Sequence, residues 1–359
     1  MNKPIYVNGI HSISPQASFN NLFFDSAVEP TPRKYFQIIA PKYRDYIPAK
    51  QLRRMAKQMK LGLIGAQKAI EDANSNSVDA IIVGTGNGNI SDTQKFLNSI
   101  IDNKERMLIP TSFVQSTNNI VAGSIALMLK NKQYNTTYTH HSAAFEISLI
   151  DAIMLFAEDK AKTILVGGID EITEETYEHK SQGDLWTKEA LNPFAIKENN
   201  YIQGAIMGES SSFFILSSQR TEHSYAQLLD VKVIHTSFES LDKILLDFLL
   251  QNNISRSQIN LLIAGFNGVE SYDKPQQKFL QNNFKNTPIA FYKHYVGEHP
   301  SASAFGFWMA NQILSSRKID ANIWYTKQSI KLNDIEYVLL FQQAYLSEKD
   351  FALILLKKT

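Results

Sequence analysis

The sequence predicts an α/β protein in which mostly parallel strands alternate with helices on both faces of the sheets. Short apolar runs such as 79–83 alternate with longer stretches of helical periodicity such as 51–72. The same order of elements occurs twice along the chain. Of the 359 residues, 44% are hydrophobic and 20% are charged, which is typical of a folded protein with a large core. Together these observations indicate a duplicated α/β unit.

The first half, residues 1–220, is predicted to run in the order β-α-β-α-β-α-β-β. In the first long helix, Met55, Met59 and Leu63 recur at helical spacing and predict one buried face. Residues 173–203 interrupt the pattern with polar, aromatic and Pro-containing sequence, so we expect a cap there. The strands are expected at 5–13, 79–83, 135–139, 162–166 and 211–216, and the helices at 51–72, 118–130 and 142–158.

The second half, residues 221–359, repeats that order without an inserted cap. Its last two strands are apolar and are joined by the polar segment 345–350. The strands are expected at 228–235, 261–264, 289–292, 337–341 and 351–356, and the helices at 240–250, 275–283 and 302–314. We therefore expect two similar halves that meet near residue 220.

Composition excludes several classes of function. The 36 Lys and Arg residues against 35 Asp and Glu give a net charge of +1, so no overall field holds a nucleic acid or an anionic membrane. The chain has no cysteine, which excludes disulfides, thiolate metal sites and a thiol nucleophile. No run of about 18 apolar residues and no basic start before an apolar stretch occurs, so we expect a cytoplasmic protein.

No cofactor or metal is predicted from the motifs. The run Gly84-Thr-Gly-Asn-Gly-Asn89 follows a strand, but its third glycine comes one position early for a dinucleotide fingerprint. His140 and His141 are adjacent on a predicted strand and would point to opposite faces, which does not suit shared metal ligation.

Three stretches of the first half resemble the β-ketoacyl-acyl-carrier-protein synthases, which have the thiolase fold. They are 116–123 (STNNIVAG), 166–171 (VGGIDE) and 207–216 (MGESSSFFIL), which occur in the family's order and at its spacing. The resemblance implies α-β-α-β-α layers with two mostly parallel five-stranded sheets. It also implies a nucleophile elbow between a strand and a helix, and counting from both sides places that position at Ser142.

The sequence departs from the family where condensation requires specific side chains. The family has a Cys at the elbow, and Ser142 would need an adjacent base to act as a nucleophile. The first family His has no counterpart, because the matching strand ends at Gly265. In the second loop Lys293 is kept, but Glu298 stands in place of the other His, with His299 one position later.

A fourth departure concerns the glycine-rich turn that comes before the last strand in active ketosynthases. The chain has no glycine after Gly306, and the matching turn reads Phe-Gln-Gln-Ala-Tyr at 341–345. Close approach of backbone amides to a reacting carbonyl is therefore disfavoured.

These departures resemble the chain-length factors, which are non-condensing partners of ketosynthases. The resemblance implies a heterodimer with a Cys-containing ketosynthase through the strand that ends at Thr139 and His140, and an acyl carrier protein as third component. It implies that Phe113 and Gln115 face a tunnel for the acyl chain and limit its length. The short chain and unusual elbow resemble subunits of polyene-pigment systems of aryl-polyene or flexirubin type.

Other functions stay open from the sequence. Ser142 could accept or decarboxylate acyl groups held by a carrier protein or CoA, with His141 or His299 as its base. Alternatively, Ser142 is a simple helix N-cap. A homodimeric binding or scaffold protein without a tunnel is a third hypothesis. Lys293 and Glu298 are then expected to form a buried ion pair in place of the lost His chemistry.

Overall fold

The structure is a computed structural model of the whole chain, and some short segments are not described. The described residues are 3–20, 32–108, 110–193, 201, 203–316, 321–326, 332–344 and 347–359. Residues 194–200 and 202 of the predicted cap, and Tyr345 of the glycine-free turn, lie outside the described residues. No helix in the described part has the length and apolar character that a membrane crossing requires.

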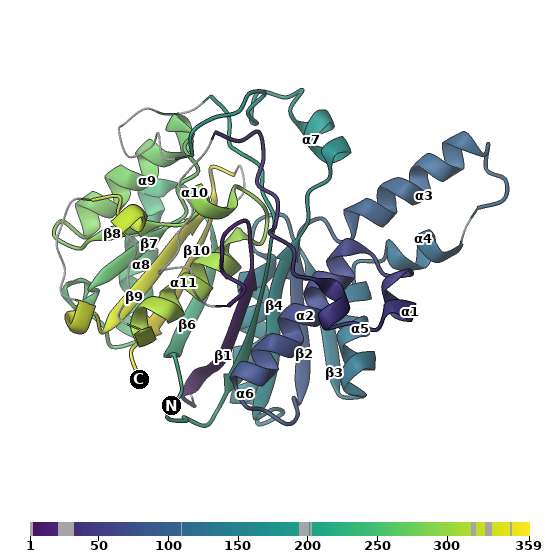
Figure 1. Cartoon of the computed structure of the whole chain (residues 1–359). Coiled ribbons are helices and arrows are strands. Elements are labelled where there is room, and N and C mark those ends of the chain that lie inside the picture. The colour runs from purple at the N-terminus through teal and green to yellow at the C-terminus, as the bar shows by residue number, and fades with distance from the viewer. Residues whose placement is uncertain are drawn as a thin grey trace.

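Ten strands form one continuous sheet in the order β3-β2-β4-β5-β1-β6-β10-β9-β7-β8 (Figure 1). The strands of the first half are β1 Ile5–Ile13, β2 Ala80–Thr85, β3 Tyr134–Thr139, β4 Thr163–Asp170 and β5 Ser210–Ser217. Those of the second half are β6 Ala226–His235, β7 Leu261–Ala264, β8 Ile289–Phe291, β9 Tyr337–Gln343 and β10 Asp350–Lys357.

Each half contributes five strands in the same arrangement, as the duplication predicts. Strands β2, β3 and β4 are parallel, and β5 is antiparallel to both β4 and β1. In the second half, β7, β8 and β9 are parallel, and β10 is antiparallel to both β9 and β6. Four strands of each half therefore run in one direction. The two five-stranded sheets join where β1 pairs with β6 in antiparallel fashion.

The helices form three layers around the two halves of the sheet. Helices α6 Ala144–Ala157 and α11 Ala302–Ser316 share one apolar cluster with strands from both halves, so they lie between them. Helices α2 Lys57–Asp72 and α5 Ile120–Leu129 cover the outer face of the first half. Helices α8 Phe238–Gln251 and α9 Glu270–Asn283 cover that of the second half. The predicted α-β-α-β-α layers are thus confirmed.

Glycines in the central strands allow the middle helices to lie close to the sheet. A Cβ at Gly84 on β2 would lie 2.5 Å from the carbonyl oxygen of Ala144, where α6 begins. A Cβ at Gly168 on β4 would lie 2.6 Å from Ala304 on α11. These close approaches place the start of α6, and with it the predicted elbow, against the ends of β2 and β4.

The helix predicted at 51–72 is broken into α1 Ala49–Leu52 and α2, so its single span was wrong. Four other helices add to those predicted from the sequence: α3 Ile90–Asp102, α4 Pro110–Gln115, α7 Glu174–Lys180 and α10 Lys293–Val296. Helices α3 and α4 form a hairpin that projects from the body where only a loop was expected (Figure 1). Helix α7 belongs to the predicted cap, and the Thr173 hydroxyl accepts the Thr176 N–H at 3.0 Å to begin it.

Candidate functional site

A histidine side chain accepts the backbone amides at the elbow between β3 and α6. His140 Nδ1 accepts the backbone N–H of Ser142 at 3.0 Å and that of Ala143 at 3.2 Å. The backbone N–H of His140 donates to the Thr85 carbonyl at the end of β2. Nδ1 therefore carries no proton, and the amides of the two residues before α6 are already bonded within the chain. Ser142 is not the N-cap residue, because Ala143 holds that position, and no side-chain hydrogen bond caps the helix there.

The Ser142 hydroxyl reaches across to the second half of the chain. Its Oγ donates to Asp350 Oδ2 at 3.3 Å, and Asp350 Oδ1 contacts His235 Nδ1 at 2.5 Å. Burial opposes ionisation of Asp350, but hydrogen bonds from His235, Ser347 and Ser142 outweigh it and hold the pKa of Asp350 below its usual value. A carboxylate with a lowered pKa is a poor proton acceptor, so this contact does not activate Ser142.

Neither of the two histidines proposed as bases contacts Ser142. His141 is exposed, and no hydrogen bond described for the chain joins it to the hydroxyl. His299 is buried, and its Nε2 contacts Ser210 Oγ at 2.8 Å. Burial, together with the nearby charge of Lys293, lowers the pKa of His299 to about 3. A neutral imidazole held on Ser210 is not positioned to deprotonate Ser142.

The other altered positions come together in the second half. Lys293 Nζ lies 2.7 Å from Glu298 Oε2, and both side chains are at most 2% exposed. Asn267 Nδ2 donates to the same oxygen at 3.2 Å. A Cβ at Gly265 would lie 3.3 Å from Lys293 Cε, so Gly265 borders the pair. The expected ion pair is present, and it lies between the end of β7 and the loop that follows β8.

Side chains fill the space around this pair. The Tyr292 hydroxyl donates to Gln342 Oε1 at 2.6 Å, and it lies 3.2 Å from where a Cβ of Gly265 would be. Gln342 lies in β9, which continues to Gln343, so the turn expected at 341–345 begins later than the sequence predicted. The void that remains beside Lys293 and Glu298 has a volume of about 10 Å³ and is walled by Phe36, Phe266 and Phe291 among others. That volume suits a single water molecule.

Two buried carboxyl groups near this region are not among the predicted site residues. Burial raises the pKa of Glu146, one turn after Ser142 on α6, to about 7. Burial also raises the pKa of Asp273 to about 7, although the N–H groups of Asn267 and Gly268 donate to it. An acidic residue near the start of the mostly apolar sequence of α6 was the available signal for Glu146.

The predicted tunnel and interface residues lie on the surface of the first half. Phe113 on α4 is 57% exposed, and its ring packs on Phe96 of α3 with centroids 5.2 Å apart. The Gln115 amide donates to the carbonyl of Arg54, so its side chain attaches α4 to the segment after α1. Thr139 is exposed at the end of β3. No described hydrogen bond or ring contact links Phe113 to the elbow.

Residues 30–227 match the family model described as the N-terminal domain of β-ketoacyl synthases. This match spans 198 of the 359 residues (227 − 30 + 1), which is more than half of the chain. The chain belongs to the β-ketoacyl synthase family. A search of curated protein sequences found no match for this β-ketoacyl synthase homologue.

Solved structures share the fold of this family member at low sequence identity. The ishigamide ketosynthase/chain length factor has a TM-score of 0.84 at 15% identity, and the match covers 100% of both chains. A type II polyketide acyl carrier protein complexed with its ketosynthase (AntDE:AntF) has a TM-score of 0.80 at 14%, again over 100% of both chains. The ketosynthase ApeO with its chain length factor ApeC, from Xenorhabdus doucetiae, has a TM-score of 0.76 at 14% and covers 99% and 98%.

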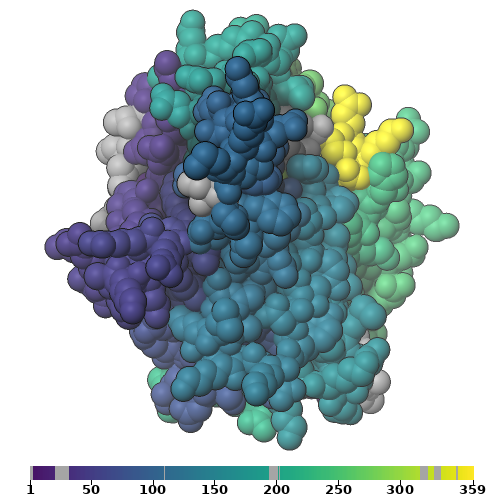
Figure 2. All heavy atoms as spheres, turned by 90° about the vertical axis from the view of Figure 1, so that its right-hand side faces the viewer, coloured from purple at the N-terminus to yellow at the C-terminus, as the bar shows by residue number. Residues whose placement is uncertain are grey.

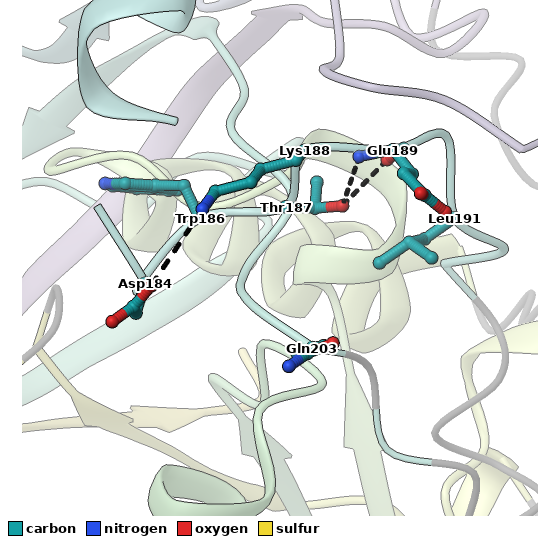
Figure 3. Close-up of a pocket in the computed structure, with 7 residues that line it drawn as sticks. All are labelled: Asp184, Trp186, Thr187, Lys188, Glu189, Leu191 and Gln203. Atoms are coloured by element: carbon teal, nitrogen blue, oxygen red, sulfur yellow. Dashed lines mark hydrogen bonds and ion pairs between the residues drawn. The ribbon is translucent and has the colours of Figure 1, made fainter. Parts of the chain in front are cut away.

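The cap of this β-ketoacyl synthase homologue contains a separate polar pocket of about 320 Å³ (Figure 3). Lys188 Nζ lies 3.9 Å from Asp184 Oδ1, and the Thr187 hydroxyl donates to the Glu189 carbonyl at 2.7 Å. Trp186 forms part of the wall and is buried. None of the predicted site residues lines this pocket, so it is distinct from the elbow.

Proposed function

We propose that the chain is a chain-length-factor-like, non-condensing subunit. It pairs with an active, Cys-containing ketosynthase in the cytoplasm and shapes the acyl tunnel in fatty-acid, polyketide or polyene assembly. The observation that carries this proposal is the buried Lys293–Glu298 ion pair at the altered position, beside a void of about 10 Å³. Polyene pigments of aryl-polyene or flexirubin type are the products we propose first.

Condensation needs a nucleophile, a base and donors aimed at the developing oxyanion. Here the Ser142 hydroxyl donates to a carboxylate, and the amides of Ser142 and Ala143 already donate to His140. His299 is held by Ser210 and is neutral. These contacts support a structural role for the elbow, and they do not favour an acyltransferase or decarboxylase that uses Ser142.

Exposed apolar side chains support a partner on the first half. Nine of the fourteen large hydrophobic residues that are exposed in the described structure lie between residues 97 and 154. Figure 2 shows that this part of the sequence, blue to teal, dominates one face of the molecule. Such a concentration of exposed apolar surface marks a protein interface. The nine are Leu97, Ile101, Met107, Phe113, Val114, Leu127, Met128, Tyr134 and Met154.

A basic segment beside this face supports docking of an acyl carrier protein. Residues 33–60 contain nine Lys and Arg residues and one acidic residue, Asp45, in a chain whose net charge is +1. Lys57 is paired with the buried Glu209, but Lys42, Arg44 and Lys60 line an open pocket of about 420 Å³. The excess positive charge attracts an anionic partner, and a carrier protein brings at least the phosphate of its phosphopantetheine arm.

Co-expression with the neighbouring Cys-containing ketosynthase tests the proposal. We expect a stable one-to-one complex that makes product, whereas the chain by itself should not condense malonyl and acyl thioesters. The Ser142→Ala variant should assemble and support product formation like the natural chain. Condensation by the isolated chain, or an acyl adduct on Ser142 seen by intact-mass measurement, would overturn the non-condensing role.

The role of the basic segment is tested by the double variant Arg53→Glu, Arg54→Glu. We expect carrier-protein binding to weaken and to lose part of its dependence on salt, because fewer phosphate and carboxylate contacts remain. Lys243→Glu on α8 reverses a charge outside this segment and serves as the control.

A further inference from the structure

Helix α5, Ile120–Leu129, carries no charged side chain, although part of its surface is exposed. Only Val121, Ala122 and Ile125 are buried, whereas Leu127 is 82% exposed and Met128 is 38% exposed. Exposed apolar side chains on an uncharged helix mark a contact surface, so the outer side of α5 is expected to be covered by another molecule.

Gly123 lies in the middle of this exposed helix without a reason inside the chain. On the neighbouring α2, a Cβ at Gly62 would lie 2.4 Å from Val121, and one at Gly65 would lie 2.8 Å from Phe213. Those glycines are required by packing. At Gly123 a Cβ would meet no described atom within 4 Å. Glycine is unfavourable in a helix interior relative to alanine, so the chain's own fold does not account for it.

The outer side of α5 is continuous with the open end of the sheet. Strand β3 is the terminal strand, pairs only with β2 and has no buried residue. Asn135 Nδ2 on β3 donates to the Ala122 carbonyl at 2.9 Å and joins the two elements. Because helices cover both faces of each half of this fold, a homologous partner that adds to β3 also brings a helix alongside α5.

We propose that Gly123 is the point of closest approach between α5 and an apolar helix of the ketosynthase partner. The missing side chain lets the partner's backbone or a bulky apolar side chain seat directly on α5. The absence of charge along α5 requires that the facing helix be apolar as well. This assignment rests on the heterodimer proposed above and names the place where the two subunits pack most closely.

Two substitutions separate this role from a role in folding. In the isolated chain, Gly123→Ala should raise the midpoint of thermal unfolding by about 1 °C, since the added methyl meets no atom and favours the helix. In the complex, the same variant should weaken association with the ketosynthase, and Gly123→Phe should weaken it by about 100-fold or more. Gly183→Phe in the cap is the matched control and should leave association unchanged.

The outcomes distinguish the two levels of the proposal. If the natural chain does not bind the ketosynthase, the heterodimer itself is wrong. If the natural chain binds and both Gly123 variants bind with unchanged affinity, only the assignment of Gly123 is overturned. A lowered unfolding midpoint for Gly123→Ala in the isolated chain would also overturn it, because the glycine would then serve the chain's own packing.

Discussion

Strands β3 and β8 occupy equivalent places at the two ends of the sheet, yet no residue of β3 is buried and every residue of β8 is. The backbone of β8 is covered by residues 323–326. Trp324 bridges Ala290, the Tyr325 N–H donates to the Ile289 carbonyl at 2.8 Å, and the Ile289 N–H donates to Thr326 Oγ1 at 3.1 Å. One end of the sheet is closed by the chain itself, and the other is left open.

The helices beside these strands differ in the same way. Helix α9 precedes β8 and carries the exposed charged residues Glu270, Lys274 and Lys278, whereas α5 precedes β3 and carries no charge. Topology is therefore shared between the halves, but surface chemistry is not. The outer surface of the second half is therefore charged and suited to water, whereas the first half has an apolar face that fits a protein partner. Substitutions in the closed half should lower the free energy of unfolding, and substitutions on the open face should weaken association with the partner.

Breaking the closed half gives the largest expected effect. Lys293→Met leaves Glu298 as an unpaired buried charge and should lower the free energy of unfolding by about 3–5 kcal/mol. Urea unfolding measures this loss of free energy. The double variant Lys293→Met, Glu298→Leu removes both charges and should recover most of the loss. Equal instability of the single and double variants would show that the pair is not the cause.

A substitution on the open face is expected to have the next largest effect. Leu127→Glu places a charge on α5, where the natural side chain is 82% exposed, and should weaken association with the ketosynthase by about 100-fold while leaving unfolding of the isolated chain unchanged. Leu250→Glu on α8, where the side chain is 60% exposed, is the matched control in the closed half. Analytical ultracentrifugation of the mixtures measures the effect. Equal weakening by both variants would remove the distinction between the two faces.

The helix layer between the halves gives a smaller, pH-dependent effect through Glu146. Its pKa rises from 4.5 to about 7 in the folded chain, so the stabilisation is complete below pH 4.5 and is lost as pH rises through about 7. The loss between pH 5 and pH 7 should be about 2 kcal/mol. When the free energy of unfolding in urea is measured across this pH range, Glu146→Gln should make its dependence on pH weaker. The dependence that remains is expected to come from Asp273. An unchanged pH dependence would contradict burial of the neutral acid.

The smallest expected effect concerns product length. Phe113 is exposed on α4, so Phe113→Ala should leave the stability of the isolated chain nearly unchanged. If Phe113 limits the tunnel in the complex, the truncated side chain should shift the product toward longer acyl chains, as measured by mass spectrometry of the reconstituted system. Leu185→Ala, which truncates an exposed side chain in the cap, is the control. The same product length from both variants would exclude Phe113 as a gate.

Most of the fold could be predicted from the sequence because the apolar runs are long and regular. The strands at 79–83, 162–166 and 211–216 were expected within a few residues of β2, β4 and β5. The α3–α4 hairpin was not predicted, although Leu97 and Ile101 recur at helical spacing; both are exposed in the structure, so this spacing does not mark a face buried in the core.

Position along the chain identified Ser142, Gly265, Lys293 and Glu298, but it did not identify their partners. Asp350 lies 208 residues from Ser142, and Asn267 lies 31 residues from Glu298. Those contacts depend on the meeting of the two halves at the elbow and at the loop after β8. The hydrogen bonds from the elbow amides to His140 were equally hidden, because no local pattern in the sequence predicts a histidine as their acceptor.

By itself, the sequence determined the duplicated α/β order and the absence of a cysteine nucleophile, since these follow from residue types and local periodicity, and it predicted the loss of the family's histidine positions. Only the tertiary structure decided that the altered site is filled, that the elbow amides are occupied, and that one sheet end is open while its equivalent is closed. These features depend on volumes and contacts between residues far apart in the chain, and no local pattern records them.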